Sequence, residues 1–274
     1  TVQCQDCQEY ELSCQDCWIS NHLSNPWHWA RVWKGSFFVR SDISTLRKRY
    51  AVQLGHHGKA CPTLDKPKLV KFTVTHSNGV HGTYISFCNC GRGSRVEQLM
   101  RARLFPASVA EPETAFTFTV MREYDLQSLQ GKIAAYDYFL SLRRLTDNVH
   151  TDQVNDPYQP FMLAARAWRY FKAQIRLGGI FNLNKRYLPH RPPEAMINYC
   201  PICPDPATNM LGDWEKTPLH LRHLIMMSTA SDGNFKLSQF HKNSGADDKS
   251  MFRGNSYFPP VQPYKEFLAS TKKS

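Results

Sequence analysis

The most regular alternation of hydrophobic and polar residues lies between residues 68 and 90. Residues 68–74 alternate, residues 77–79 read Ser-Asn-Gly, and residues 83–87 alternate again. Successive side chains of a strand point to opposite faces of a sheet, and Asn-Gly is a favoured turn between two strands. The pattern therefore predicts a β-hairpin. A shorter run, residues 33–39, is typical of a single strand.

Helical periodicity dominates the middle of the chain. Apolar residues at three- and four-residue steps lie on one face of a helix. Between residues 126 and 140 this spacing predicts a buried face of Leu126, Leu129, Ile133, Tyr136 and Leu140. Between residues 161 and 175 it predicts a second buried face of Phe161, Ala165, Trp168, Phe171 and Ile175. The pair Gly178-Gly179 predicts the end of the second helix.

The composition is that of a folded chain outside the secretory route. The 274 residues are 42% hydrophobic, which is enough to bury a core. No run approaches the ~20 apolar residues of a membrane helix, and no export signal is visible. Because the first residue is Thr1, we expect the natural protein to begin upstream of it. Nine cysteines, most of them in close pairs, indicate metal ligands in a reducing compartment, the cytosol or the nucleus.

The first 28 residues contain six candidate metal ligands. These are Cys4, Cys7, Cys14, Cys17, His22 and His28. A Cys-x-x-Cys turn directs two thiolates to one point, and a tetrahedral zinc ion needs four such donors. The spacing therefore predicts a small zinc-held module at residues 1–32.

Two ligand sets fit this module. A sequential site would use the four cysteines. In a cross-braced, B-box-like module, the first cysteine pair would join the two histidines. The second cysteine pair would then share another zinc ion with ligands upstream of residue 1. Six ligands are too many for one tetrahedral ion and too few for two, which favours the cross-brace.

A second set of candidate ligands surrounds the predicted hairpin. It consists of His56, Cys61, His81, Cys88 and Cys90. Positions two apart in a strand share a face, so the thiols of Cys88 and Cys90 can point to one site at the end of the hairpin. His56 and Cys61 could complete that site from a glycine-containing loop, and His81 is a fifth candidate. The set predicts another zinc site.

A third cysteine pair lies near the C-terminal end. Cys200 and Cys203 form a Cys-x-x-Cys turn, and His220 and His223 follow at a spacing that suits one helical face. The two histidines could supply the missing donors of a zinc site. The alternative is a pair of reduced thiols in a tight turn.

The charge balance indicates a polyanionic partner. Lysine and arginine outnumber the acids by 34 to 23, giving a formal net charge of +11. Nucleic acid is the most common partner of such a chain. The candidate phosphate contacts are Arg47, Lys48, Arg49, Lys66, Lys68, Lys71, Arg143, Arg144, Lys185 and Arg186. The alternative for each is a solvated surface charge.

Short motifs follow one another along the chain in a specific order. They are Cys-Gln-Asp-Cys at 14–17, Pro-Trp-His at 26–28, Trp-Lys-Gly-Ser-Phe-Phe at 33–38, Gln-Leu-Gly-His at 53–56, Cys-Pro at 61–62, Asn-Gly-Val-His at 78–81 and Phe-Cys-Asn-Cys at 87–90. The order continues through residues 99–107, 142–148, 200–204, 213–215 and 232–237. It resembles the CxC-type cysteine-cluster domain found with fungal KDZ (Kyakuja–Dileera–Zisupton) transposases. The resemblance covers nearly the whole chain.

This resemblance implies a zinc-binding region that assists DNA recognition, followed by a transposase core of the RNase H type. It places Asp232 as the first catalytic acid of that core. Two-metal phosphodiester chemistry needs several carboxylates, and the family's later acids lie beyond the equivalent of Tyr264. We therefore expect an incomplete core with no cleavage activity of its own. The family's partners for the Cys200 pair also lie farther downstream, and a nuclear location follows from a function on DNA.

Together these observations predict an α+β fold in four regions. They are a zinc-stabilised module at 1–32, a β-rich cysteine-cluster region at 33–115, a helical region at 116–195, and the start of a truncated RNase H-like core at 196–274. The predicted function is a zinc-binding, DNA-associated and catalytically incomplete part of a KDZ-type transposase. The alternative is a zinc-dependent protein-interaction module, which Trp18, Trp27 and Trp29 would support if exposed. No membrane association is expected.

Overall fold

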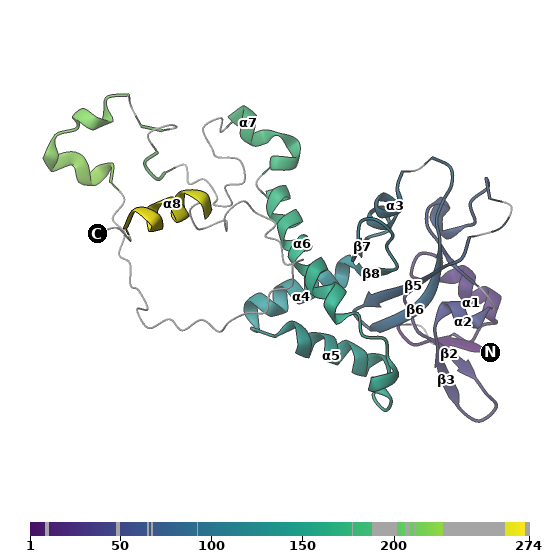
Figure 1. Ribbon diagram of the computed structural model, residues 1–274. Coiled ribbons are helices and arrows are strands. Elements are labelled where there is room, and N and C mark those ends of the chain that lie inside the picture. Colours follow the sequence, from purple (N-terminus) through teal and green to yellow (C-terminus); the bar gives the residue numbers. More distant parts are fainter. Residues whose placement is uncertain are drawn as a thin grey trace. The chain divides into compact units, whose positions relative to one another are not determined.

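The computed structural model has a mixed α+β architecture (Figure 1). It describes residues 1–8, 11–47, 50–64, 66, 68–91, 93–176, 178–187, 202–205, 209–210, 212–226 and 261–271. The chain divides into two compact units, Thr1–Arg169 and Tyr170–Ser274. The expected α+β class is therefore confirmed. The RNase H-like core stays a prediction, because residues 227–260 lie outside the described residues.

The N-terminal unit begins with a small antiparallel sheet. Its strands, in the order β1-β2-β3, are β1 (Val2–Cys4), β2 (Ala30–Trp33) and β3 (Phe38–Ser41). The short helix α1 (Gln15–Asn21) lies between β1 and β2 in sequence, and the short helix α2 (Ile43–Leu46) follows β3. The single strand expected at residues 33–39 is wrong. Trp33 pairs with Phe38, and residues 34–37 between them form the turn of a β2–β3 hairpin.

A second, mixed sheet forms the centre of this unit. Its strands are β4 (Val52–Gln53), β5 (Val70–His76), β6 (Gly79–Ser86), β7 (Leu104–Pro106) and β8 (Thr114–Thr117), in the order β4-β6-β5-β8-β7. The predicted hairpin is confirmed as β5 and β6. His76 pairs with Gly79, so the turn proper is Ser77-Asn78. Helix α3 (Arg95–Arg101) leads into β7.

The two faces of the central sheet cover two different cores. On β8, Ala115 belongs to the core shared with the N-terminal sheet, whereas the adjacent Phe116 belongs to the core shared with the helices. Leu104 and Phe105 of β7 divide in the same way. Strand side chains alternate between faces, so one strand can serve both cores. The sheet is therefore buried on both sides.

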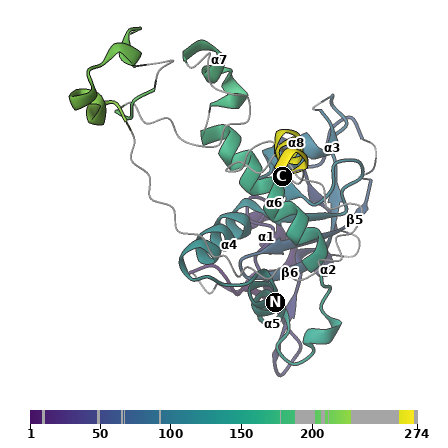
Figure 2. The ribbon, with the colours of Figure 1, turned by 60° about the vertical axis from the view of Figure 1, so that its left-hand side comes forward.

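Three helices make up the second core. They are α4 (Phe118–Gln130), α5 (Ala135–Thr146) and α6 (Tyr158–Arg176), and they lie on the side of the sheet away from the N-terminal strands (Figure 1; Figure 2). The predicted helix at residues 161–175 is confirmed as α6, with Phe161, Ala165 and Trp168 buried. Its predicted buried face is wrong at the C-terminal end, where Ile175 is 44% exposed.

The single helix predicted around residues 126–140 is wrong. Gly131 closes α4, and α5 begins afresh at Ala135. The predicted buried face is mostly on the surface, with Leu126 63% and Tyr136 58% exposed. The buried side chains are instead Val120, Met121, Tyr124, Tyr138, Phe139 and Leu142. The apolar residues on either side of the break keep the spacing of one continuous helix, but they lie on the solvent-exposed faces of two separate helices, α4 and α5.

The first 32 residues share the core of the central sheet. Val2, Trp18 and Trp27 belong to the same buried cluster as Phe72 and Ile85. The four-region division expected from the sequence stays a prediction. Its first two regions, however, pack against each other through one continuous apolar core.

The unit Tyr170–Ser274 contains short helical segments among its described residues. They are 3₁₀ turns at Gly179–Phe181, Trp214–Lys216 and Leu219–Leu224, and helices α7 (Leu183–Tyr187) and α8 (Val261–Thr271). Within the described part of the chain, no helix has the length and apolar character needed to span a bilayer.

Gly79 is expected to tolerate no side chain. Its φ is +140°, and an added Cβ would lie 2.5 Å from Thr146 Oγ1 and 3.3 Å from the ring of Trp29. Gly79→Ala should therefore lower the free energy of unfolding by about 2 kcal/mol, measured by urea denaturation. Gly82→Ala on the same strand is the control, because a Cβ there meets nothing within 4 Å. Equal stability of the two variants would contradict the steric argument.

Candidate metal centres

The first candidate centre collects four side chains from three loops around the small sheet. Cys4 ends β1, Cys7 follows in the next loop, His22 caps the end of α1, and His28 precedes β2. Their ligand atoms all lie within 4.8 Å of one another, and the group could hold a metal ion. We call Cys4, Cys7, His22 and His28 the N-terminal group.

The spacing of these atoms fits a tetrahedral ion. Bonds of about 2.3 Å to sulfur and about 2.0–2.1 Å to imidazole nitrogen separate the ligand atoms by roughly 3.5–3.8 Å. His28 Nδ1 lies 3.5 Å from Cys4 Sγ and 3.4 Å from Cys7 Sγ. His22 Nε2 lies 3.4 Å from Cys7 Sγ. The side chains are therefore already arranged around a point that one small cation can occupy.

Neighbouring groups orient His22 for this role. His22 Nδ1 lies 2.8 Å from the carbonyl oxygen of Trp18, which can only accept a hydrogen bond. The proton is thus held on Nδ1, and Nε2 presents its lone pair to the cysteines. The indole of Trp18 stacks on the imidazole at 3.9 Å. Burial of Trp18 therefore fixes the direction of a ligand.

The Cys4 thiol has an acidic pKa. Burial opposes its ionisation, but hydrogen bonds from His22 and His28 and from backbone amides outweigh burial and hold the pKa at about 5. Cys7 N–H is one of those amides, 3.3 Å from Cys4 Sγ. A thiolate is the form of cysteine that binds metals. Cys4 can therefore act as a ligand at neutral pH.

The second candidate centre lies at the end of the hairpin β5–β6. His56 stands in a 3₁₀ turn, His56–Gly58, Cys61 in the loop that follows it, and Cys88 and Cys90 just beyond β6. The ligand atoms again lie within 4.8 Å of one another. We call His56, Cys61, Cys88 and Cys90 the hairpin group.

The distances in the hairpin group also fit one tetrahedral ion. Cys61 Sγ lies 3.7 Å from Cys88 Sγ and 3.4 Å from Cys90 Sγ. His56 Nε2 lies 3.2 Å from Cys88 Sγ and 3.6 Å from Cys90 Sγ. A hydrogen bond from the Thr63 hydroxyl is the largest of the effects that lower the pKa of Cys61 to about 5. The group therefore offers three sulfurs and one nitrogen.

Cys88 and Cys90 converge for a different reason than the strand pattern suggested. Strand β6 ends at Ser86, so neither cysteine lies in a strand. The chain instead turns around the first sulfur, and Cys90 N–H donates to Cys88 Sγ at 3.4 Å. The expectation that both thiols reach one site is met by a turn and not by alternation along a strand.

Gln98 of α3 fixes this turn, a role that the sequence did not reveal. Its Oε1 accepts the Cys88 N–H at 2.8 Å, and its Nε2 donates to the Cys88 carbonyl at 3.0 Å and to the Gly93 carbonyl at 3.2 Å. Gln98 is buried. No sequence pattern links a glutamine to a cysteine ten residues away. Only the folded structure shows that Gln98 holds the backbone of Cys88 in place.

The two groups are next to each other in the fold. Gly58, from the turn that begins with His56, approaches Leu23, the residue after His22. A Cβ on Gly58 would lie 2.9 Å from the Leu23 carbonyl oxygen. His56 and His57 adopt left-handed φ angles of 48° and 55°, which are energetically costly for residues other than glycine. The close packing of the two loops holds this turn in place.

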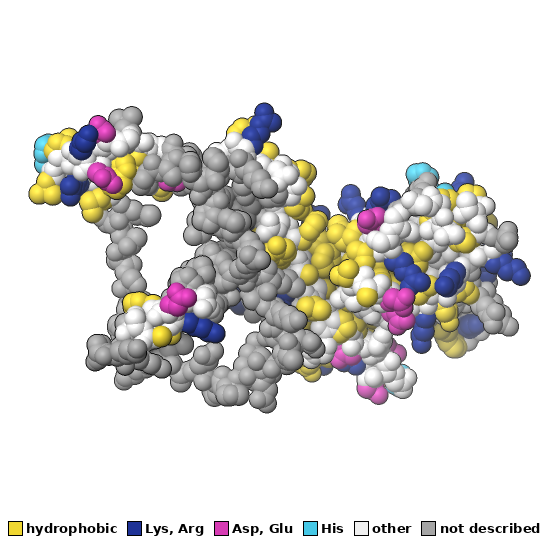
Figure 3. Space-filling view, turned by 45° about the horizontal axis from the view of Figure 1, so that its top comes forward, with side chains coloured by type: hydrophobic (Ala, Val, Ile, Leu, Met, Phe, Trp, Pro, Cys, Tyr) yellow, Lys and Arg dark blue, Asp and Glu magenta, His cyan; other side chains and the backbone are white. Residues whose placement is uncertain are grey.

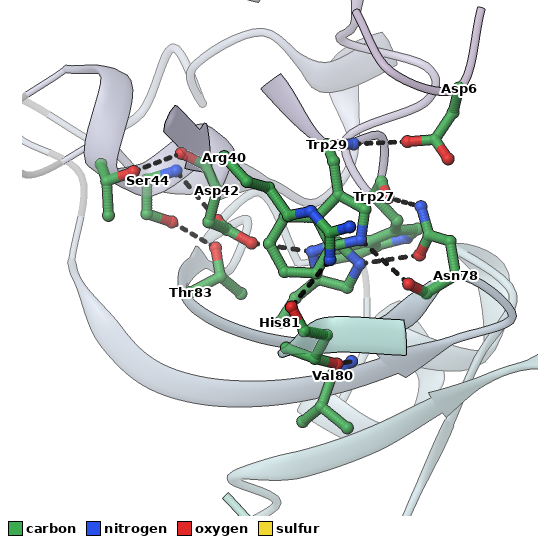
Figure 4. A network of polar contacts seen from close by, with 12 residues as sticks. Asp6, Trp27, Trp29, Arg40, Asp42, Ser44, Asn78, Val80, His81 and Thr83 are labelled. Carbon is green, nitrogen blue, oxygen red and sulfur yellow. Dashed lines mark hydrogen bonds and ion pairs between the residues drawn. The ribbon is translucent and has the colours of Figure 1, made fainter. Parts of the chain in front are cut away.

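His81 does not join the hairpin group. It is fully buried on β6, with Nδ1 2.8 Å from Asp42 Oδ2 and Nε2 2.9 Å from Asn78 Oδ1 (Figure 4). The Asn78 amide nitrogen donates to the Trp27 carbonyl at 2.8 Å, so its oxygen is the atom that faces the imidazole. Both ring nitrogens therefore face oxygen acceptors and are not directed at the cysteines.

Cys14 and Cys17 stand apart from the N-terminal group. Both are exposed, and Cys17 N–H lies 3.3 Å from Cys14 Sγ at the start of α1. Of the two ligand sets considered for residues 1–32, the structure gathers the one with two histidines. The sequential four-cysteine set is not gathered.

The third cysteine pair falls partly outside the described residues. Cys200 and Asp232 are among the residues that the structure does not describe. Cys203, His220 and His223 are described and exposed, and the structure gathers no third ligand group among the residues it describes.

The basic candidates divide by their surroundings. Lys48, Arg49 and the side chain of Lys185 lie outside the description. Arg143 is held inside the unit by Asp156 and by the Thr151 carbonyl. Lys66, Lys68, Lys71 and Arg144 are exposed. On the face drawn in Figure 3, lysine and arginine side chains of the N-terminal unit are spread out and do not gather in one patch.

Comparison with known proteins agrees with this picture of a cysteine–histidine cluster protein. Residues 47–150 match the family described as CxC2 like cysteine cluster associated with KDZ transposases. The matched segment contains the whole hairpin group and Gln98. The resemblance seen in the motif order is thereby confirmed for these residues. No curated protein and no solved structure matches the chain significantly.

Metal stoichiometry tests both groups. Chain purified under reducing conditions should carry two ions, and Cys7→Ser and Cys61→Ser should each remove one, as counted by native mass spectrometry. Cys14→Ser is the control and should keep both ions. Chelation should lower the melting temperature, because metal binding is coupled to folding of these loops. A metal-free chain with an unchanged melting temperature would refute the assignment.

Gln98→Ala should weaken metal binding at the hairpin group without removing a ligand. Loss of such a supporting residue typically costs about 10- to 100-fold in metal affinity. Competition with a chromophoric chelator measures this loss. Gln127→Ala on α4, where the side chain bonds only to Glu123, is the matched control. The site on the N-terminal group should be unaffected in both variants.

Proposed function

We propose that the N-terminal unit is a zinc-organised DNA-binding part of a KDZ-type transposase. The observation that carries the proposal is the hairpin group, which lies inside the segment matched by a transposase-associated family. A cluster that holds loops in one conformation can present side chains to a partner with little loss of conformational entropy on binding.

Zinc is the proposed ion because of the ligand chemistry. The N-terminal group offers two thiolates and two imidazoles, and the hairpin group three thiolates and one imidazole. Closed four-ligand sets of this kind are typical of structural zinc, which prefers tetrahedral sulfur and nitrogen ligands. With no position left for water, both ions would stabilise the fold and would not catalyse a reaction.

Cys14 and Cys17 are proposed as half of a further zinc site. Their amide-to-sulfur distance of 3.3 Å equals that between Cys7 N–H and Cys4 Sγ in the N-terminal group. Two thiolates are two donors short of a tetrahedral site. The missing donors would come from another segment, as in a cross-braced, B-box-like module.

Charge around the hairpin group supports DNA as the partner. Residues 51–96 contain six lysine and arginine residues and a single acid, Asp65. Lys66 and Lys68 lie between the Cys61 loop and β5, Lys71 lies at the start of β5, and all three are exposed. A cationic segment held by a metal site can contact phosphates of the DNA backbone. A nuclear location follows from this role.

A protein-interaction module is the second candidate function, but exposed tryptophans do not support it. Trp18, Trp27 and Trp29 are buried and cannot contact a partner. What favours it now is the apolar surface of α4 and α5, where Leu126 and Tyr136 are exposed. Absence of DNA binding by metal-loaded protein at low salt would leave this candidate in place.

Salt dependence tests the DNA proposal. Metal-loaded protein should bind duplex DNA with an affinity that falls steeply with salt, measured by fluorescence anisotropy at several salt concentrations. Replacing Lys66, Lys68 and Lys71 together by Ala should weaken binding and reduce the slope of log K against log salt by about 3. Replacing Arg122, Lys216 and Lys265 by Ala removes the same charge elsewhere and should change neither. If both triple variants lowered the DNA affinity and the salt slope equally, DNA would not contact Lys66, Lys68 and Lys71.

A further inference from the structure

The β2–β3 hairpin carries aromatic and cationic side chains on one face. Trp33 pairs with Phe38 across the strands, and Arg31 pairs with Arg40. Cross-strand partners of an antiparallel pair lie on the same side of the sheet. The rings of Trp33 and Phe38 meet edge to face at 4.9 Å, and the Arg31 guanidinium lies over Phe38 at 5.1 Å. Aromatic and guanidinium groups thus form one continuous row.

The inner end of this row is anchored in the core. The guanidinium of Arg40 lies over Trp29 at 5.2 Å and donates to the carbonyls of Leu145 and Thr146 at the end of α5. Trp29 stacks on the buried His81 at 4.1 Å (Figure 4). The base of the β2–β3 hairpin is therefore attached firmly to the rest of the unit.

The outer end is exposed and apolar. Trp33 is 43% and Phe37 60% exposed, and the tip of the hairpin projects from the N-terminal unit (Figure 1). Lys34 N–H donates to the Phe37 carbonyl at 2.9 Å, which fixes the backbone of the turn. Neither ring contributes to either buried core. Packing within the chain therefore does not explain them.

Charge selects the kind of partner. Residues 30–41 contain Arg31, Lys34 and Arg40 and no acidic residue. Arg40 is used internally, whereas Arg31 and Lys34 flank the exposed rings. Exposed aromatic rings beside cations offer stacking to bases and ion pairs to phosphates, the combination that single-stranded nucleic acid uses. A polyanion with flat apolar faces fits this surface better than an apolar protein segment does.

We propose that the β2–β3 hairpin is a binding site for unpaired nucleotides of DNA. Trp33 and Phe37 stack on exposed bases, and Arg31 and Lys34 contact the adjoining phosphates. This inference rests on the proposed DNA-binding function and adds to it a preference for unwound DNA or single-stranded ends. Lys66, Lys68 and Lys71, near the ligand group of the β5–β6 hairpin, supply affinity that does not depend on DNA sequence. Trp33 and Phe37 of the β2–β3 hairpin distinguish unpaired bases from duplex DNA.

The test compares three ligands with the metal-loaded 274-residue chain at one salt concentration. They are a labelled single-stranded oligonucleotide, an abasic oligonucleotide of the same length and charge, and a blunt duplex. Trp33→Ala and Phe37→Ala should each weaken binding of the base-bearing single strand about 10-fold and leave the abasic strand and the duplex unchanged. Trp33→Tyr should restore most of the affinity, because it keeps a stacking ring.

Leu126→Ala is the control, since it removes an apolar side chain of α4 that is about as exposed as Phe37. Both aromatic side chains are exposed, so the melting temperatures of the variants should match that of the parent. Unchanged single-strand affinity in Trp33→Ala and Phe37→Ala, with the lysine variant still impaired, would overturn base stacking and leave DNA binding intact. A parent protein that binds none of the three ligands would instead refute the proposed function itself.

Discussion

Thiolates and imidazoles that converge on two points are the constraint on which the N-terminal unit depends. Cys4 and His28 are 24 residues apart in sequence, and His56 and Cys90 are 34 apart, yet each pair belongs to one ligand group. The segments between them carry helix α1 and the hairpin β5–β6, whose buried side chains enter the first core, but the ligands themselves lie at element ends and in the connecting loops. An ion that closes such loops offsets much of the conformational entropy lost on folding.

A buried polar network joins the parts that the ligand groups organise. Asp42 caps α2 by accepting the Ser44 N–H at 3.0 Å and also binds His81 of the central sheet. Asn78, in the turn of the β5–β6 hairpin, links His81 to Trp27, the residue before His28. Because every member has a partner, the network fixes the angle between the two sheets. The β2–β3 hairpin projects from this fixed base.

The sequence predicted elements well where one physical signal acted alone. Strict alternation located the β5–β6 hairpin, and a long amphipathic period located α6. It failed where two signals overlapped. Leu126, Leu129 and Tyr136 kept helical spacing across the break between α4 and α5, although Gly131 ends the first helix. Periodicity reports spacing but not which side of a helix meets the core, so the outer faces were taken for the inner ones.

The sequence alone determined residue types and their local spacing. From these came a set of candidate ligands that includes all eight residues of the two groups, the excess of positive charge, and the resemblance to the transposase-associated cysteine cluster that matches residues 47–150. Such features depend on chemistry and on near neighbours along the chain. Only the tertiary structure decided which ligands meet, why His81 does not, and that Gln98 supports a cysteine turn. It also buried Trp18 and exposed Trp33, because burial depends on contacts between residues that are distant in sequence.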